Sequence, residues 1–158
     1  MNSLILAKEE NSIVEVYYEN EDSESFSMGF IDSVSENYFG VKALDCFGNP
    51  LGYEVRRTSE VSIVKKYTEH TNKIKIFYDN YNDSFIEEYG FEKKLDNIMF
   101  EVVNRIFLKE DFVSLLIDGF DALIDGCIKS FNNNIIEFLM ISQYGEEDGI
   151  CFIDLKSI

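Results

Sequence analysis

The chain has 158 residues, of which 46% are hydrophobic and 15% aromatic, enough apolar material to fold one larger domain or two small ones. Nine Gly and a single Pro argue against a disordered chain. Fourteen basic residues against 30 acidic ones give a net charge of −16. Such a charge repels phosphate backbones and anionic lipid head groups, so it disfavours nucleic acid and membrane surfaces as partners.

The acidic excess is spread along the chain rather than gathered in a tail. Residues 1–66 carry a net charge of −6, residues 67–111 carry −4 and residues 112–158 carry −6. A negative surface steers basic proteins toward contact, and it also serves solubility without any partner. A basic protein is therefore the expected partner, and nucleic acid is not.

The cysteines and the first residues favour a cytoplasmic protein. Cys46, Cys127 and Cys151 are odd in number, widely spaced and without a C-x-x-C pair, which suits buried thiols in a reducing compartment. The apolar run at residues 3–7 is too short for a signal peptide and is ended by the charged residues at 8–10. No stretch approaches the ~20 apolar residues that cross a bilayer. We expect no membrane contact.

Residues 1–66 have the composition of a small β-unit. β-branched and aromatic residues predict five strands, at residues 13–18, from 26 onward, 38–44, 53–57 and 61–64. Gly29 predicts a bend or bulge in the second strand. The succession of Gly48, Asn49 and Pro50 predicts the turn before the fourth strand.

Residues 111–158 repeat this pattern. A shift of the chain by 97 residues places Gly29 over Gly126, Gly48 over Gly145 and Gly52 over Gly149. Glycine is fixed by backbone geometry, so coincident glycines indicate a repeated unit. Strands are predicted at residues 112–117, 122–131, 135–142 and 150–153, with a last short strand near Ile158.

Residues 67–110 between these units are predicted to be a helical connector. Apolar residues from Leu95 to Phe107 recur at spacings of three and one, which predicts an amphipathic helix at about 91–108. Apolar and aromatic residues between Ile74 and Tyr81 indicate a weaker helix before it. The apolar stripe of the 91–108 helix would serve a partner or, as we expect, pack on the strands of one unit.

The predicted fold is therefore mostly β (α+β). It consists of two repeated five-stranded small barrels or curled antiparallel sheets, joined by a helical segment. A helix, five strands, a glycine in the second strand and a turn between Gly48 and Gly52 resemble the Sm-like (LSm) small barrel. This resemblance implies the Sm-like fold for each unit. Because Sm-like proteins bind RNA, it also implies RNA binding as a possible function.

The RNA-binding positions of the Sm-like family are mostly changed in this chain. The Asp and Asn of the first family motif are replaced, in the two units, by Ser35, Phe39, Asn132 and Ile136. The Arg-Gly pair of the second motif is replaced by Arg57 with Thr58 and by Asp154 with Leu155. Only Arg57 is retained. The resemblance thus implies the fold and disfavours Sm-type RNA binding, which is kept as the alternative function.

The sequence offers no catalytic set, so we predict that the chain is not an enzyme and holds no cofactor. His70 is the only histidine and has no recognisable nucleophile near it in the sequence. The cysteines lack zinc-ligand spacing. The acidic residues at 118–125 and 145–149 do not fit an EF-hand, and no phosphate-binding glycine motif occurs.

These patterns lead to a non-catalytic, cytoplasmic protein-binding module. One specific form is an immunity-type protein that neutralises a basic toxin domain. A hydrolase that uses scattered carboxylates is the weakest alternative. The candidate binding residues are Arg56, Arg57, Glu146, Glu147 and Asp148. The two arginines would form a basic patch with Lys42, Lys65 and Lys66 if folding gathers them on one face, and the three acidic residues lie in a predicted hairpin turn.

Overall fold

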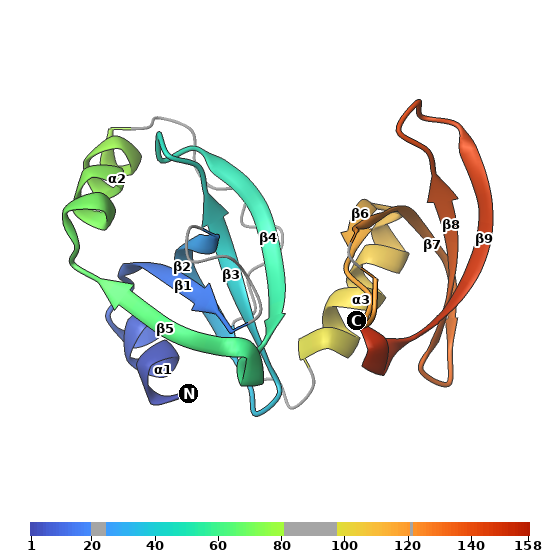
Figure 1. Cartoon of the computed structure of the whole chain (residues 1–158), viewed down its shortest axis with the longest axis horizontal. Helices are drawn as coiled ribbons and strands as arrows, with labels where there is room; N and C mark the ends of the chain where they lie inside the picture. The colour runs from blue at the N-terminus through green and yellow to red at the C-terminus, as the bar shows by residue number, and fades with distance from the viewer. Residues whose placement is uncertain (20–24, 81–97, 121) are drawn as a thin grey trace. The chain divides into compact units, whose positions relative to one another are not determined.

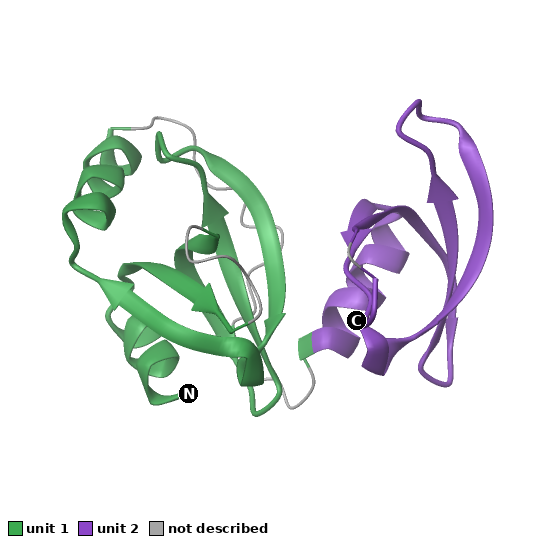
Figure 2. Cartoon of the chain, in the orientation of Figure 1, with its two compact units in different colours: residues 1–98 green, residues 99–158 purple. Residues whose placement is uncertain are grey.

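The computed structural model describes residues 1–19, 25–80, 98–120 and 122–158. The chain forms two compact units, unit 1 (Met1–Ile98) and unit 2 (Met99–Ile158), and each is built on one antiparallel sheet (Figures 1 and 2). The chain is therefore mostly β, as predicted. The division falls inside the segment expected to be a connector, after the first residue of its second helix, so the first helix belongs to unit 1 and nearly all of the second to unit 2.

Unit 1 contains all five strands predicted for it. Its elements are α1 (Asn2–Glu9), β1 (Ile13–Tyr18), β2 (Phe26–Val34), β3 (Tyr38–Leu44), β4 (Pro50–Arg57), the 3-10 helix η1 (Thr58–Glu60), β5 (Val61–Lys66) and α2 (Glu69–Asp79). The strand order is β4-β3-β2-β1-β5. Since η1 carries the chain from one edge strand to the other and these edges do not pair, the sheet is curled but not closed into a barrel.

The sheet of unit 1 is covered by a helix on each face. Because side chains alternate along a strand, β1 points Val14 and Val16 to one face and Ile13 and Glu15 to the other. We call the first the inner face; there α1 contributes Leu4 and Ala7 to a cluster with Val14, Val16, Ile31, Phe39 and Val41. The second is the outer face; there Ile74 and Tyr78 of α2 pack with Ile13, Met28, Phe30 and Leu44. Each large side chain that is fully buried stabilises the fold by about 1.5–3 kcal/mol.

Unit 2 has four strands rather than the five predicted. Its elements are α3 (Ile98–Lys109), β6 (Phe112–Leu115), β7 (Ile124–Asn132), β8 (Ile135–Ile141), β9 (Glu147–Asp154) and the 3-10 helix η3 (Leu155–Ser157), and its strand order is β6-β7-β8-β9. The predicted last strand near Ile158 is wrong. The side chain of Asp154 accepts a hydrogen bond from the Lys156 N–H at 3.0 Å, and this local turn forms η3 instead.

Helix α3 packs on the inner face of its own sheet. Its residues Ile98, Met99, Val102 and Val103 are buried. The ring of Phe100 lies 5.2 Å from the ring of Phe131 on β7. Phe131 is paired with Ile136, a fully buried residue of β8 that marks the inner face of this sheet. The predicted helix at about 91–108 is therefore seen from Ile98 onward, while 91–97 lie outside the described residues.

Two neighbouring strands of each sheet share their limits at a constant spacing of 97 residues. β8 and β9 begin and end 97 residues after β3 and β4, and the pairs Ile31–Val41 and Ile128–Phe138 precede the same register shift. A Cβ on Gly29 would lie 2.0 Å from the Lys42 carbonyl oxygen, and one on Gly126 would lie 1.9 Å from that of Leu139. Only glycine allows the neighbouring strand to approach so closely.

Candidate functional site

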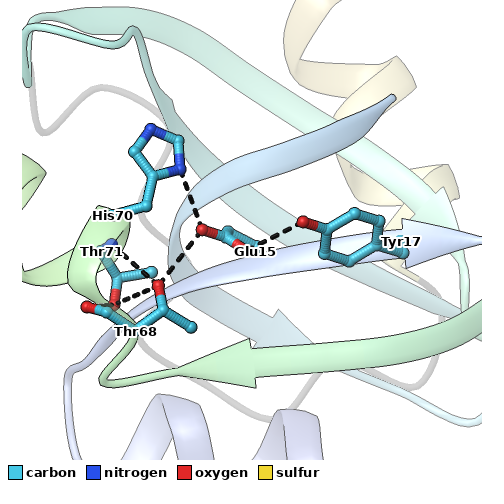
Figure 3. A network of polar contacts seen from close by, with 5 residues as sticks. All are labelled: Glu15, Tyr17, Thr68, His70 and Thr71. Carbon is cyan, nitrogen blue, oxygen red and sulfur yellow. Dashed lines mark hydrogen bonds and ion pairs between the residues drawn. The ribbon is translucent and has the colours of Figure 1, made fainter. Parts of the chain in front are cut away.

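The outer face of unit 1 holds a buried carboxylate that ties α2 to the sheet. The side chain of Glu15, on β1, is only 5% exposed. Its Oε1 lies 2.9 Å from Nδ1 of His70 and accepts a hydrogen bond from the Thr68 hydroxyl at 3.3 Å, while its Oε2 accepts one from the Tyr17 hydroxyl at 2.9 Å (Figure 3). A buried charge is tolerated only where such donors replace water, so this carboxylate is satisfied by its neighbours.

Local sequence places each member of this network. Glu15 and Tyr17 are two apart on β1 and therefore share the outer face. Thr68 is the N-cap of α2 and accepts a hydrogen bond from the Thr71 N–H at 3.0 Å, so one side chain both starts the helix and links it to the sheet. His70 follows in the first turn of α2 and meets the ring of Phe26 edge-on at 5.9 Å.

The network anchors helix α2 to the sheet. Glu15 fixes the imidazole of His70 through Nδ1, and the other ring nitrogen points away from the carboxylate (Figure 3). Among the described residues, the His70 ring is hydrogen-bonded to Glu15 and to no serine or cysteine. Within the described ranges, no group of three or more His, Cys, Asp or Glu side chains is placed to hold a metal ion.

Sequence reasoning noticed His70 but missed Glu15, its main partner. The available signal was a single acidic residue inside the apolar and aromatic strand Ile13–Tyr18. A strand of this kind with one charge at an otherwise buried position predicts a paired carboxylate. The identity of its partner could not be predicted from the strand alone, since His70 is 55 residues away in the chain.

The two predicted arginines do not lie on one face. Arg56 and Arg57 are neighbours on β4, so their side chains point to opposite sides of the sheet. The guanidinium of Arg56 lies 4.6 Å from the centre of the Tyr18 ring, and its Nε lies 3.5 Å from Oε2 of Glu54. Nη1 of Arg57 lies 3.7 Å from Oε1 of Glu60.

The lysines of the expected basic patch also have local partners. Nζ of Lys42 lies 3.1 Å from a carboxylate oxygen of Asp32, and Nζ of Lys66 lies 2.6 Å from one of Glu10. Nζ of Lys65 lies 4.1 Å from the centre of the Tyr17 ring. The fold therefore gives each of these cations an acidic or aromatic neighbour.

The three predicted acidic residues project from the hairpin between β8 and β9. Glu146 precedes β9, Glu147 and Asp148 are its first two residues, and all three are exposed. The hairpin is closed by hydrogen bonds from the Ser142 N–H to the Glu146 carbonyl at 2.8 Å and from the Gly145 N–H to the Ser142 carbonyl at 2.9 Å. These residues thus form one acidic, solvent-facing turn.

The outer face of unit 2 combines exposed apolar residues with acidic ones, a feature that sequence reasoning missed. Direct pairing across the four strands gives a row of apolar residues: Phe112, Cys127, Leu139 and Ile150. Phe112 is 59% exposed, Ile150 53% and the neighbouring Phe152 73%, whereas Leu139 within the row is 8% exposed. Asp125, Glu137 and Asp154 share this face by alternation along the strands, and Glu147 joins them because it pairs, after a register shift, with Ile141, two residues from Leu139.

No family model, curated protein or solved structure matches this chain. The class defined by its fold is a two-unit, mostly β protein with a helix on the inner face of each sheet. None of its described helices is long and apolar enough to cross a membrane. Because no comparison matches, the resemblance to Sm-like proteins rests on the order of elements and on the glycines alone.

Proposed function

We propose that this chain is a non-catalytic protein-binding module whose partner is a basic protein. The observation that carries the proposal is the outer face of unit 2, where Phe112, Ile150 and Phe152 are more than half exposed. Exposed apolar side chains gathered on one face, with charged residues around them, are typical of protein-interaction sites. Large aromatic residues at the centre of such a face supply most of the binding free energy.

The charge of unit 2 supports a basic partner. Residues 112–158 contain eight acidic residues and only two basic ones, Lys129 and Lys156. The acidic turn at Glu146, Glu147 and Asp148 adds to the acidic residues on the outer face. Opposite charge raises the association rate and penalises acidic competitors, while burial of the apolar row supplies affinity. An immunity-type protein that neutralises a basic toxin domain is one form of this function, and the acidity of the chain fits it.

We also propose that the two units are copies of one Sm-like unit. Support comes from the matched strand limits, from the shared register shift, and from Gly29 and Gly126, each of which faces a carbonyl of the next strand. The Sm-like order of elements does not favour RNA as the ligand. Arg57, the retained RNA-binding position, is paired with Glu60, and its counterpart in unit 2 is Asp154.

A capture experiment with matched variants tests the proposed function. The full chain is immobilised as wild type, as Ile150→Ser with Phe152→Ser, and as Leu51→Ser, and bound proteins from cells of its source are identified by mass spectrometry. Leu51 is the control because it is 67% exposed on β4 of unit 1. We expect basic proteins on the wild type and on Leu51→Ser, released by raising salt from about 0.15 to 0.5 M, and lost with the double variant.

Two outcomes of this capture experiment would contradict the proposed function. Retention of the same proteins by all three forms, or retention of nucleic acid in place of basic proteins, would contradict the proposal. Circular dichroism on each variant checks that the folded state is kept, as expected for substitutions at exposed positions.

A further inference from the structure

The outer faces of the two sheets carry equivalent rows of residues, and only one row is covered by a described helix. In unit 1 the row across β1, β2, β3 and β4 is Ile13, Phe30, Lys42 and Tyr53. In unit 2 the row in the same register across β6, β7, β8 and β9 is Phe112, Cys127, Leu139 and Ile150. The strands are therefore paired in the same way along the two rows, and only the side chains differ.

In unit 1, α2 lies over the first half of this row. Ile74, which is fully buried, packs with Ile13 and Phe30, and the ring of Tyr78 lies 5.0 Å from that of Phe30. Ile74 and Tyr78 are four residues apart and so lie on one side of the helix. Covered in this way, Ile13 is 4% exposed and Phe30 9%.

In unit 2 the two ends of the row face solvent, whereas its third residue, Leu139, is 8% exposed. Phe112, the counterpart of Ile13, is 59% exposed, and Cys127, the counterpart of Phe30, is half-buried. The helix that the structure describes in unit 2, α3, packs on the inner face through Phe100 and Phe131. The outer face therefore presents apolar surface of the kind that α2 covers in unit 1.

A carboxylate lies beside the row in both units, on β1 in unit 1 and on β7, the second strand, in unit 2. In unit 1 the next pair along β1 and β2 is Glu15 with Met28, and Glu15 binds His70 of the covering helix. In unit 2 the corresponding pair is Ser114 with Asp125, and the Ser114 hydroxyl donates a hydrogen bond to Asp125 at 2.5 Å. A carboxylate at this end favours the N-terminus of a helix and any cation in its first turn.

We propose that the outer face of unit 2 binds one amphipathic, basic α-helix of the partner protein, placed as α2 is placed on unit 1. This inference rests on the proposed function and specifies the partner's contact element. The helix would direct its N-terminus toward Asp125. It would carry a Lys, Arg or His in its first turn, followed at intervals of four residues by two large apolar side chains, as in the series His70, Ile74 and Tyr78.

Charge complementarity predicts basic residues along the flanks of the bound helix. Glu137 and Glu147 lie on the same outer face, beyond the apolar row, so Lys or Arg at the flanks of the docked helix would meet them. α2 itself would fit poorly at these flanks because Glu69 and Asp79 lie near its two ends. The apolar pattern of α2 with added positive charge is thus the best simple probe.

The test uses a peptide of residues 67–80 in which Asn72→Lys and Asp79→Lys make it basic, titrated against the full chain by fluorescence anisotropy. The companion peptide adds Ile74→Asp and Tyr78→Asp. We expect saturable binding of the first peptide, weakened at high salt, and at least about tenfold weaker binding of the second. Phe112→Ser and Asp125→Asn in the protein should each weaken binding of the first peptide, and Leu51→Ser should not.

Alkylation of the cysteines locates the peptide. Cys127 lies within the apolar row and Cys46 is exposed in unit 1, so the peptide should slow maleimide modification of Cys127 and leave that of Cys46 unchanged. Burial raises the pKa of the Cys151 thiol, which should react slowly in every sample. Protection of Cys127 by the first peptide and not by the second supports the inference.

The failures of the two proposals are distinguishable. If captured basic proteins protect Cys127 but the peptide does not, the face binds something other than a helix, so this inference is wrong and the proposed function stands. If neither protects Cys127, both are wrong. Binding of the peptide with no protection of Cys127 and no effect of Phe112→Ser would mean that it occupies another site, which also overturns the inference.

Discussion

Nδ1 of His70, in the first turn of α2, lies 2.9 Å from Oε1 of Glu15, whose side chain is 5% exposed on β1. This contact joins two elements that are 55 residues apart in the chain. It explains how a carboxylate can be buried in a strand of apolar and aromatic residues. It also makes the position of α2 dependent on one polar contact in addition to the packing of Ile74 and Tyr78.

Replacement of His70 should therefore loosen α2. In His70→Ala, Glu15 keeps its bonds to Tyr17 and Thr68 but loses one donor, so we expect the free energy of unfolding to fall by about 1–3 kcal/mol. Urea unfolding measures the loss, and faster amide exchange over residues 69–79 locates it.

The control lies on the same helix. Lys75 and Asp79 form an ion pair at 3.0 Å whose side chains are more than half exposed, so Lys75→Ala should change stability by no more than about 0.5 kcal/mol. Equal effects of the two substitutions would show that the Glu15–His70 contact is no stronger than a surface ion pair.

The close approach at Gly126 predicts a steric effect in unit 2. A Cβ there would lie 1.9 Å from the Leu139 carbonyl oxygen and 2.9 Å from the Phe138 ring, so β7 and β8 would have to separate. Gly126→Ala should reduce stability by at least about 2 kcal/mol. Lys129→Ala, at an exposed position of the same strand, is the control and should be nearly neutral. Hydrogen exchange over β7 and β8 reports both variants.

Local chemistry accounts for what could be predicted of the fold. β-branched and aromatic runs set the five strands of unit 1, and glycines with fixed roles set the turns and close approaches in both units. The missing fifth strand of unit 2 has a local cause too, because Asp154 caps the 3-10 turn Leu155–Ser157. A capping side chain outweighed the strand propensity of the last residues.

The candidate site could not be predicted in the same way because it depends on faces and pairings. Alternation along β4 already implied that Arg56 and Arg57 point to opposite sides, and that rule should have divided the basic patch between the two faces. The row from Phe112 to Ile150 is different. Its four residues come from four strands, and only the pairing register brings them onto one face.

The contact between Glu10, Lys66 and Tyr67 predicts two linked pKa shifts in unit 1. A hydrogen bond from Nζ of Lys66 at 2.6 Å, with a second from the Tyr67 hydroxyl at 2.8 Å, lowers the pKa of Glu10 below its ordinary value of 4.5. The same hydrogen bond to Glu10 raises the pKa of Tyr67 above 10.0. NMR titration should find both shifts, and Glu10→Gln should lower the pKa of Tyr67.

The two pKa shifts make stability depend on pH in opposite directions. The lowered pKa of Glu10 gives a contribution that is present above pH 4.5 and is lost as the pH falls through the folded-state value. The raised pKa of Tyr67 gives one that is present below pH 10.0 and is lost as the pH rises through its folded-state value. Lys66→Met should raise the pKa of Glu10 toward 4.5; an unchanged value would refute the role of Lys66.

RNA binding provides a direct comparison with the alternative function. Arg57 is paired with Glu60, and the chain carries a net charge of −16, so we expect no saturable binding of oligo-U at about 0.15 M salt. Filter binding of oligo-U and of a mixed single strand measures it. Micromolar binding that disappears in Arg57→Ala would place RNA ahead of a basic protein as the ligand.

Ile13 and Phe112 offer the most direct test of whether the outer face of unit 2 is open. They occupy the same place in the two rows, but Ile13 is 4% exposed beneath α2 and Phe112 is 59% exposed. Ile13→Ser removes a buried side chain and introduces a hydroxyl, so it should cost about 2–5 kcal/mol. Phe112→Ser should cost less than about 1 kcal/mol, because most of the ring already contacts water. Amide exchange over β1 and β6 measures each effect in its own unit. A loss of stability for Phe112→Ser as large as that for Ile13→Ser would mean that the Phe112 ring is covered in solution. The outer face of unit 2 would then not be free to bind a partner.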